Sequence, residues 1–411
     1  MATLEFLQRA LVLGLARSGR AASAALARRG VEVVGADRAL GNDEETALLA
    51  GVGLLVKSPG IPGEHPLVLA ARERGIAVWS EVELGSRLRP NPILGVTGTN
   101  GKTTTCALLG EIFGAAGRPV AVAGNIGRAI CELDADIEPE AWIVCELSSF
   151  QLEDVHELRP RIAVLLNLEP DHLDRHATFA AYRDAKLRVF ENQLPEDAAV
   201  VPRGFGPVPG SGRRIEFAWD DPLPAEPRIA GAHNRENAAA ATAAARAAGI
   251  GDEAIAGALE SFRGVRHRLE LVAEAAGVRY VNDSKATNVA SARRALDAYA
   301  LDPVHLILGG SRKGEDLGPL AGAIGPNVKR VYLIGETADE FAVLLPNAVN
   351  AGTLQRALAL AARAASAGDV VLLSPACASY DQFADYEHRG EEFRRLVENL
   401  DGCGGASKVT S

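Results

Sequence analysis

The sequence predicts an α/β protein whose parallel sheets are covered by helices on both faces. Short apolar runs of the length of buried strands alternate with longer helical patterns along the chain. Glycine-rich or polar turns follow these runs, at the strand ends where such sheets bind their ligands. Because 411 residues exceed one ordinary hydrophobic core, we expect two or three domains.

The first segment has the pattern of a strand–helix–strand unit. An apolar run at residues 10–14 precedes an alanine-rich helix that ends near residue 29, and a second strand at residues 31–34 ends before Asp37. A further apolar run at residues 52–56 leads into the turn Ser58-Pro59-Gly60.

The turn after the first strand resembles a dinucleotide-binding fingerprint. It reads G-x-A-x-x-G, with Asp37 about 20 residues beyond it, in the string Gly14-Leu15-Ala16-Arg17-Ser18-Gly19. By itself this pattern favours an NAD site. The methyl group of Ala16 weakens that interpretation, because it obstructs a close approach of the backbone to a pyrophosphate.

Two more segments follow. The proline-containing stretch 89–92 predicts a linker, and residues 261–264 predict the next boundary. We expect strands at 93–96, 142–145 and 162–168, an irregular excursion at 202–228 and an alanine-dense helix at 234–248. Beyond them we expect buried strands at 305–308, 331–334 and 370–373, and a disordered tail from Asp401.

The strongest motif is a glycine loop between the strand at 93–96 and the next helix: Gly98-Thr99-Asn100-Gly101-Lys102-Thr103-Thr104. Backbone N–H groups and the helix N-terminus converge on phosphate oxygens in such a loop. Lys102 is expected to reach the β- and γ-phosphates, and the Thr103 hydroxyl to bind Mg²⁺. The spacing is compressed relative to the standard Walker form, since Val96 stands where that form has a glycine.

Polar residues follow two other predicted strands of this segment. Glu146 comes directly after one of them, and Asp171, His172 and Asp174 come after another. Each alone is more typical of a helix cap or a solvated loop. Together, at the carboxyl ends of strands in one sheet, they favour a metal site.

Composition excludes several classes of protein. Five widely spaced cysteines without a C-x-x-C pair argue against a disulfide framework or a zinc site and favour a reducing compartment. A formal charge of −10 argues against a nucleic-acid partner. There is no apolar run of the ~20 residues that span a bilayer and no signal-peptide pattern, so we expect a cytoplasmic protein without a membrane partner.

Seven strings in chain order resemble the Mur ligases of peptidoglycan synthesis, over residues 14–390. They are the glycine loop 98–104, and then 146–152, 171–174, His233-Asn234, His267-Arg268, 282–288 and 373–379. Two of them, Ser148-Ser149-Phe150-Gln151 and Asp283-Ser284-Lys285-Ala286-Thr287, resemble the branch that adds D-glutamate to UDP-N-acetylmuramoyl-L-alanine.

The resemblance implies three domains and a reaction. The domains are a Rossmann-like domain for the UDP substrate at 1–91, a central P-loop ATPase-type domain at 92–264 and a Rossmann-like glutamate domain at 265–411. In the reaction, ATP phosphorylates the carboxylate of UDP-MurNAc-L-Ala, and the amine of D-glutamate displaces phosphate from the acyl phosphate. The resemblance also implies two Mg²⁺ ions, and we expect a monomer.

Roles for single residues follow from the same resemblance. Metal ligands are implied at Thr103, Glu146, His172 and Lys186, with Lys186 carbamylated, whereas its sequence context alone suggests a surface lysine on a helix. Active-site roles are implied for Lys102, His267 and Lys285, and nucleotide contacts for the glycine loop, Asn237, Arg268 and Asp283.

The two other substrates have their own implied contacts. Those to the UDP substrate are Gly14, Leu15, Ala16, Ser18, Gly19, Asp37, Arg38, Ser58, Gly60 and Asn125. Those to glutamate are Thr287, Lys313, Ser379 and Tyr386, where the family often has phenylalanine in place of Tyr386.

Several alternatives stay open. A related ligase is one, either adding L-glutamate or belonging to another Mur or folylpolyglutamate synthase type. An NAD-dependent dehydrogenase is another, but it leaves the loop at Gly98 unexplained. A non-catalytic P-loop regulator is the third, although no switch element or partner surface is recognisable.

Overall fold

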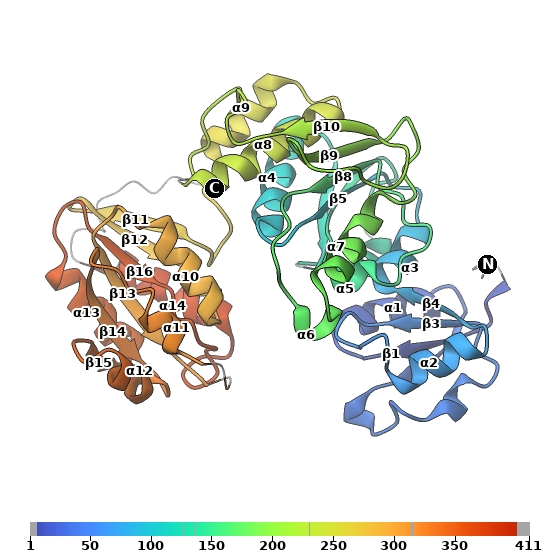
Figure 1. Cartoon of the computed structure of the whole chain (residues 1–411), viewed down its shortest axis with the longest axis horizontal. Helices are drawn as coiled ribbons and strands as arrows, with labels where there is room; N and C mark the ends of the chain where they lie inside the picture. Colours follow the sequence, from blue (N-terminus) through green and yellow to red (C-terminus); the bar gives the residue numbers. More distant parts are fainter. Residues whose placement is uncertain are drawn as a thin grey trace. The chain divides into compact units, whose positions relative to one another are not determined.

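The computed structural model describes residues 6–125, 127–135, 137–229, 231–312, 314 and 316–400. The chain divides into two compact units, Met1–Phe262 and Arg263–Ser411, and each is described by itself. The first unit holds a four-stranded and a six-stranded sheet, and the second holds another six-stranded sheet (Figure 1). The predicted α/β class with parallel sheets is confirmed.

The first sheet has the strand order β2-β1-β3-β4, and all its neighbours are parallel. Its strands are β1 (Arg9–Leu13), β2 (Glu32–Ala36), β3 (Leu54–Lys57) and β4 (Ala77–Ser80). Its helices are α1 (Arg17–Ala27), α2 (Pro66–Glu73) and α3 (Glu81–Arg87), with short 3-10 turns at Arg38–Leu40 and Thr46–Leu49. Ala10 and Val12 pack toward α1, whereas Leu11 and Leu13 pack toward α2, as the period of two in a strand requires.

The central sheet has the order β10-β9-β8-β5-β7-β6 and is also fully parallel. Its strands are β5 (Ile93–Thr97), β6 (Val120–Gly124), β7 (Trp142–Glu146), β8 (Ile162–Leu165), β9 (Ala198–Pro202) and β10 (Arg213–Phe217). Its helices are α4 (Lys102–Ala115), α5 (Ser149–Leu152), α6 (Leu173–His176), α7 (Phe179–Leu187), α8 (Ala232–Ala247) and α9 (Asp252–Ser261), with 3-10 turns η4 (Ile130–Ala135) and η5 (Arg188–Phe190).

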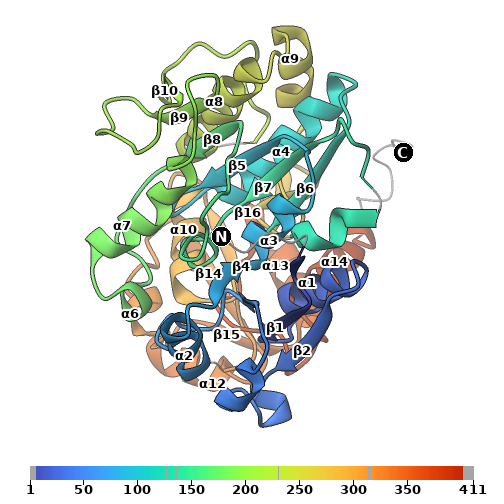
Figure 2. The same ribbon diagram turned by 90° about the vertical axis from the view of Figure 1, so that its right-hand side faces the viewer.

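Helices cover both faces of the central sheet. Helices α4, α8 and α9 pack together along one face. Helix α4 contacts β5 and β7, helix α8 contacts β8, and Figure 2 shows these helices and strands. On the other face, Cys145 and Leu165 pack against Leu152 of α5 and Phe190 of η5. Buried apolar side chains on both faces hold the strand ends in place, so the loops at the carboxyl edge have a fixed base.

The sheet of the second unit has the order β11-β12-β16-β13-β14-β15. Its strands are β11 (Glu270–Ala275), β12 (Val278–Asn282), β13 (Val304–Gly309), β14 (Val328–Ile334), β15 (Val349–Gly352) and β16 (Val370–Leu373). Its helices are α10 (Val289–Ala298), α11 (Gly318–Ala321), α12 (Ala338–Leu344), α13 (Leu354–Ala364) and α14 (Tyr386–Glu398). Helices α10, α11 and α12 cover one face, and α13 and α14 cover the other.

Three expectations about local structure need correction. The stretch 202–228 is not wholly irregular, because it contains edge strand β10. The strand expected at 162–168 ends at Leu165, since the residues beyond it turn toward the glycine loop. Strand β11 runs antiparallel to β12, in a sheet that is otherwise parallel. The tail from Asp401 lies outside the described residues.

Among the helices that the structure describes, none is long and apolar enough to cross a bilayer.

Candidate active site

The carboxyl edge of the central sheet brings the glycine loop between two neighbouring strands. Strand β5 lies between β7 and β8, with Val96 beside Glu146 and Thr97 beside Leu165. The loop after β5 is therefore flanked by the end of β7 and by the segment that follows β8. Glu146 thus ends one of the two strands next to the loop's own strand, and the segment that contains His172 follows the other.

The glycine loop turns from β5 into α4 through two glycines with positive φ. The φ values are 149° at Gly98 and 84° at Gly101. A Cβ atom on Gly101 would overlap the side-chain amide of Asn237 on α8, so this close approach requires glycine. The backbone N–H of Asn100 donates to Oδ1 of Asn167 at 2.8 Å. The segment after β8 therefore holds the loop in its turn.

The threonines of the loop are buried in it. Oγ1 of Thr99 accepts from the backbone N–H of Glu169 at 3.0 Å and lies 3.0 Å from the hydroxyl of Tyr182. Thr103 and Thr104 stand in the first turn of α4 and are also buried. Because the first N–H groups of a helix have no partner within it, this turn offers donors and a positive dipole end to an anion.

Two lysines converge on the loop's carbonyl oxygens. Nζ of Lys102 donates to the oxygens of Gly98 at 2.8 Å and Thr99 at 2.9 Å, and Nζ of Lys186 donates to the Gly98 oxygen at 2.7 Å. Lys186 is 2% exposed and lies 4.8 Å from the centre of the Tyr182 ring. Burial, reinforced by the charge of Lys102, lowers the pKa of Lys186 to about 7. The interpretation of Lys186 as a surface lysine is wrong.

Glu146 has one occupied and one free carboxylate oxygen. Its side chain is buried at the end of β7, and Oε1 accepts from the amide of Asn125 at 3.1 Å. Oε2 is buried as well and has no hydrogen-bond partner within the described residues. A buried carboxylate oxygen without a donor is costly, so this atom fits a bound cation or a donor supplied by a ligand.

His172 lies at the same edge in a strained backbone conformation. Its φ is 52°, its ring is 4.9 Å from that of Phe150, and Nε2 is 3.7 Å from Oδ2 of Asp171. About half of its side chain is exposed. Within the described residues, no three His, Cys, Asp or Glu side chains form a ready-made metal cluster. The Asp174 side chain lies outside the described residues.

Arg175 ties this edge to the first sheet. Its Nη2 donates to the backbone oxygen of Ile61 at 2.8 Å and to Oε2 of Glu153 at 2.7 Å. Glu153 also accepts from Nζ of the buried Lys57, at the end of β3, at 3.0 Å. The turn that contains Ser58 and Gly60 is therefore linked to the segment that carries His172.

The turn after β1 is stabilised by its own contacts. The Ser58 hydroxyl donates to the Gly14 oxygen at 2.6 Å, and a Cβ on Gly19 would overlap that same oxygen. Oδ2 of Asp37 accepts from the backbone N–H of Leu15 at 2.5 Å, and backbone donors lower the pKa of Asp37. The remaining predicted contacts are Ala16 and Ser18 at the start of α1, exposed Arg38 in the following 3-10 turn and Gly60 in the turn after β3.

In the second unit, polar residues gather at the ends of β12 and β16. Asp283 is 5% exposed, and its carboxylate accepts from the Ser374 hydroxyl at 2.7 Å and from the Leu269 backbone at 3.2 Å. Burial raises the pKa of Asp283 to about 7. His267 is buried beside Asn282, with 3.1 Å between Nδ1 and the amide, and desolvation lowers the pKa of His267.

Most of the other predicted residues of this unit lie around the same strand ends. Nζ of Lys285 is 5.8 Å from the centre of the Tyr386 ring, and the backbone N–H of Thr287 donates to the Lys285 oxygen. Ser379 is buried in the segment after β16. Arg268 is half-buried just before β11. Lys313 lies outside the described residues.

Two side chains shape the loop: sequence reasoning did not single out Tyr182, and it named Asn167 only as part of the polar segment that follows β8. Tyr182 contacts both Thr99 and Lys186. It stands four residues before Lys186, on the same helix face, which is the signal that could have found it. Asn167 contacts Asn100, and its position two residues beyond the end of β8 is the corresponding signal.

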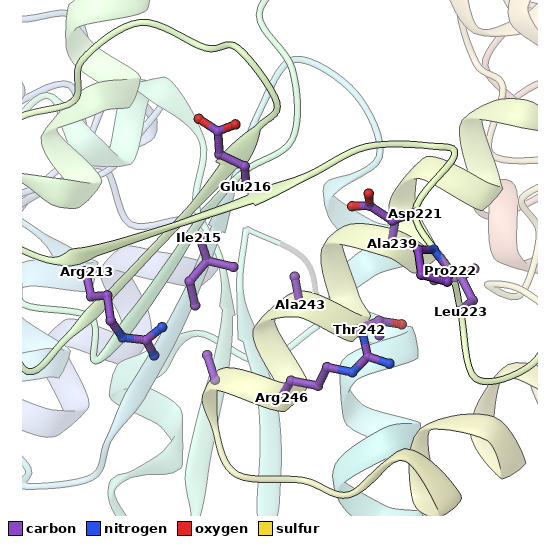
Figure 3. Close-up of a pocket in the computed structure, with 11 residues that line it drawn as sticks. Arg213, Ile215, Glu216, Asp221, Pro222, Leu223, Ala239, Thr242, Ala243 and Arg246 are labelled. Carbon is purple, nitrogen blue, oxygen red and sulfur yellow. The ribbon is translucent and has the colours of Figure 1, made fainter.

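A cavity of about 310 Å³ lies elsewhere, between edge strand β10 and helix α8 (Figure 3). It is lined by Ile215, Leu223, Ala243 and neighbouring residues, with Arg213 and Arg246 at its border. The guanidinium of Arg246 is paired with Asp252 at 2.8 Å. None of the predicted site residues lines this cavity, so it is separate from the glycine loop.

Comparison with known proteins assigns the family. The Mur ligase middle domain matches residues 96–204, and the Mur ligase glutamate ligase domain matches residues 267–377. A UDP-N-acetylmuramoylalanine–D-glutamate ligase of Acidobacterium capsulatum is 42% identical, over 95% of this chain and 96% of the relative. The chain belongs to the Mur ligase family.

Further relatives of this Mur ligase agree in sequence and in fold. The UDP-N-acetylmuramoylalanine–D-glutamate ligase of Anaeromyxobacter dehalogenans is 44% identical, over 95% of this chain and 97% of the relative. The crystal structure of the UDP-N-acetylmuramate–alanine ligase of Thermotoga maritima has a TM-score of 0.58 at 18% identity, over 96% of this chain and all of the other. At that identity the second likeness shows the fold alone.

Proposed function

We propose that this Mur ligase joins D-glutamate to UDP-N-acetylmuramoyl-L-alanine in peptidoglycan precursor synthesis, with conversion of ATP to ADP and phosphate. The observation that carries the proposal is the edge where the glycine loop meets Lys102, Lys186 and the free oxygen of Glu146. Relatives of about this length, more than 40% identical, are named for that reaction. In water, a carboxylate must be activated before it can form an amide. The groups at this edge are suited to activating a carboxylate by phosphorylation.

As a Mur ligase the chain uses ATP and Mg²⁺. The loop from Gly98 to Thr104 would hold the phosphates, with Lys102 facing the β- and γ-phosphates and Asn237 beside the loop. For this, Lys102 must leave the carbonyl oxygens of Gly98 and Thr99, which it now contacts. Arg268 and Asp283 are proposed as further nucleotide contacts. Lys102 would neutralise the charge that develops when the substrate carboxylate attacks the γ-phosphorus.

The donors at this edge fit Mg²⁺. Thr103 and Glu146 would hold a first ion, and the buried Oε2 of Glu146, which has no hydrogen-bond partner within the described residues, is the atom that most needs a cation. When bound, Mg²⁺ supplies charge that lets the carboxylate and the phosphates approach each other. A second ion would be held by His172, with carbamylated Lys186 as a further ligand.

Lys186 is proposed to react with CO₂ and become a carbamate. A neutral amine is required, and a pKa of about 7 leaves Lys186 substantially neutral at physiological pH. The ammonium group first loses one proton to water. The neutral amine nitrogen then forms a bond to the carbon of CO₂ and releases a second proton to water, so that an anionic oxygen ligand replaces the original cation. This change turns the repulsion between Lys186 and Lys102 into attraction.

The UDP substrate is assigned to the four-stranded sheet of the first unit, and glutamate to the sheet of the second unit. The turn from Gly14 to Gly19 with Asp37, Arg38, Ser58 and Gly60 would hold the UDP group, and Asn125 would contact the muramoyl-alanine end. Thr287, Lys313, Ser379 and Tyr386 would bind glutamate, with His267 and Lys285 beside the reacting amine. We further propose domain boundaries after residues 91 and 264, a monomeric state and a cytoplasmic location.

A substrate-omission assay tests the proposal. Purified protein is mixed with ATP and Mg²⁺, and phosphate release is measured with and without UDP-MurNAc-L-Ala and with D-glutamate, L-glutamate or neither. We expect phosphate release that requires the nucleotide substrate and D-glutamate together. Release that requires the nucleotide substrate and L-glutamate, and does not occur with D-glutamate, would assign the chain to a related ligase. Release independent of both substrates would contradict a ligase function.

A further inference from the structure

Arg389, in the first turns of α14, is a buried cation at the carboxyl edge of the second unit's sheet. It is 0% exposed and is among the largest fully buried side chains of the described residues. Arginine is rarely buried to this degree unless a structural or binding role requires it. None of the roles proposed above uses it.

The guanidinium of Arg389 cross-links two loops. Nε donates to the Ser284 hydroxyl at 3.0 Å, and Nη2 donates to the Ser284 backbone oxygen at 2.9 Å. Nη1 donates to the oxygen of Ala378 at 3.0 Å, and Nη2 donates to that of Cys377 at 3.0 Å. Ser284 follows β12, and the other two acceptors follow the adjacent strand β16. One side chain thus fixes the distance between two neighbouring strand ends.

These are the loops that carry proposed glutamate contacts. Ser379 is the next residue after Ala378, and Thr287 lies three residues after Ser284. The Ser284 hydroxyl also donates to the backbone oxygen of Tyr386 at 2.8 Å. Arg389 and Ser284 therefore hold three segments of the proposed amino-acid subsite together.

The charge of Arg389 has no direct counter-charge. All four acceptors are neutral, and no carboxylate of the described residues lies within 4.0 Å of the guanidinium. Among the carboxylates, Asp381 and Asp283 act on it electrostatically, and burial raises the pKa of Asp283 to about 7. A buried cation without a paired anion is destabilising on its own, but it gives the loops around it a positive potential that water screens weakly.

We propose that Arg389 is a positioning residue for the amino-acid subsite and that its uncompensated charge favours an amino acid with two carboxylates. The proposal rests on the proposed function, because the loops it joins are assigned to glutamate there. The four hydrogen bonds of the guanidinium group set the geometry of the loops. The positive charge attracts the two carboxylates of the amino-acid substrate. These two contributions are separable by substitution.

Two variants separate them, with Arg395 as the matched control. Arg389→Lys keeps the charge and loses the planar fork, whereas Arg389→Met loses both. Arg395 stands on the same helix, is exposed and pairs with Glu392, so Arg395→Met removes a charge without entering the subsite. Steady-state kinetics of each purified variant are measured for all three substrates, together with circular dichroism to verify folding.

We expect Arg389→Met to raise KM for D-glutamate about 100-fold, and Arg389→Lys about 10-fold. KM for ATP and for the UDP substrate should stay within about twofold, and Arg395→Met should match the parent. A purely structural role would instead lower activity toward all substrates alike. A folded Arg389→Met enzyme with unchanged KM for D-glutamate overturns the proposal.

Arg389→Lys decides the question if the methionine variant does not fold, since an unchanged KM for D-glutamate in the lysine variant also overturns the proposal. The failure of the proposed function has a different signature. In that case the parent protein itself shows no D-glutamate-dependent phosphate release, whereas failure of the Arg389 proposal leaves that release intact.

Discussion

The carboxyl edges of the two six-stranded sheets are built on opposite principles. At the central edge, Lys102 and Lys186 share the Gly98 oxygen, and a buried oxygen of Glu146 has no hydrogen-bond partner in the part of the chain that the structure describes. At the other edge, both oxygens of Asp283 accept hydrogen bonds, and Arg389 makes four. The central edge therefore holds groups that a ligand must complete, whereas the other is already assembled around its polar residues.

The largest expected effect is at the central edge. Lys102→Met removes the cation that is proposed to face the phosphates, and we expect kcat to fall about 1,000-fold. Lys102→Arg should also be strongly impaired, because the wide, planar guanidinium cannot replace the compact ammonium group proposed to face the phosphates. A Lys102→Met enzyme that retains a tenth of the parent kcat in the phosphate-release assay would mean that the loop does not act on the transferred phosphate.

Lys186→Ala should have the next largest effect, a loss of about 100-fold in activity. Lys186 is assigned a carbamate that supplies anionic oxygens, so acetate or formate is expected to restore part of the activity. Arg183→Gln on the same helix is the control, because Arg183 is exposed and pairs with its neighbour Asp184. Full activity of Lys186→Ala would exclude the carbamate role.

The buried amine of Lys186 also predicts a pH-dependent stability in CO₂-free buffer. Its pKa is about 7 in the native state and 10.5 when unperturbed, so between these values the unfolded chain binds more protons. The free energy of unfolding therefore rises with pH across this range, by up to about 1.4 kcal/mol per pH unit. Urea denaturation at pH 7 and 9 should show this rise relative to Lys186→Met, and parallel stabilities of the two proteins would contradict it.

Asp283 at the other edge predicts the smallest effect, with the opposite sign. Its pKa is about 7 in the native state and 3.8 when unperturbed, so between these values the native chain binds more protons and loses stability as pH rises. The free energy of unfolding of Asp283→Asn minus that of the parent should therefore be larger at pH 7 than at pH 5. Thermal denaturation at both pH values measures this difference, and an identical difference at both would show that Asp283 titrates normally.

The fold and the glycine loop were readable from the sequence because their signals are local. Periodic apolar runs gave the strands, and the loop lies between a strand and a helix within a few residues. Strand β10 was missed because prolines and glycines surround it. Its signal was the alternation of exposed Arg214 and Glu216 with inward Ile215 and Phe217.

The buried charges were harder to predict because their partners are distant in the chain. Lys186 contacts an oxygen 88 residues away, and Arg389 contacts Ser284 105 residues away. The sequence does contain one signal for the burial of Arg389. It is spaced four residues from Phe393 and eight from Val397, so it lies on the same buried face of α14. Which arginine of a charged helix is buried depends on the loops that receive it, and these meet in the folded sheet.

The central claim is that the glycine loop is the place where a carboxylate is phosphorylated. UDP-MurNAc-L-Ala with ¹⁸O in both carboxylate oxygens tests it, by mass spectrometry of the released phosphate. In the proposed reaction one labelled oxygen bonds to phosphorus and leaves with it, while the other stays in the new amide. The account predicts phosphate with one ¹⁸O atom for each D-glutamate adduct, and unlabelled phosphate accompanying the same adduct would contradict it.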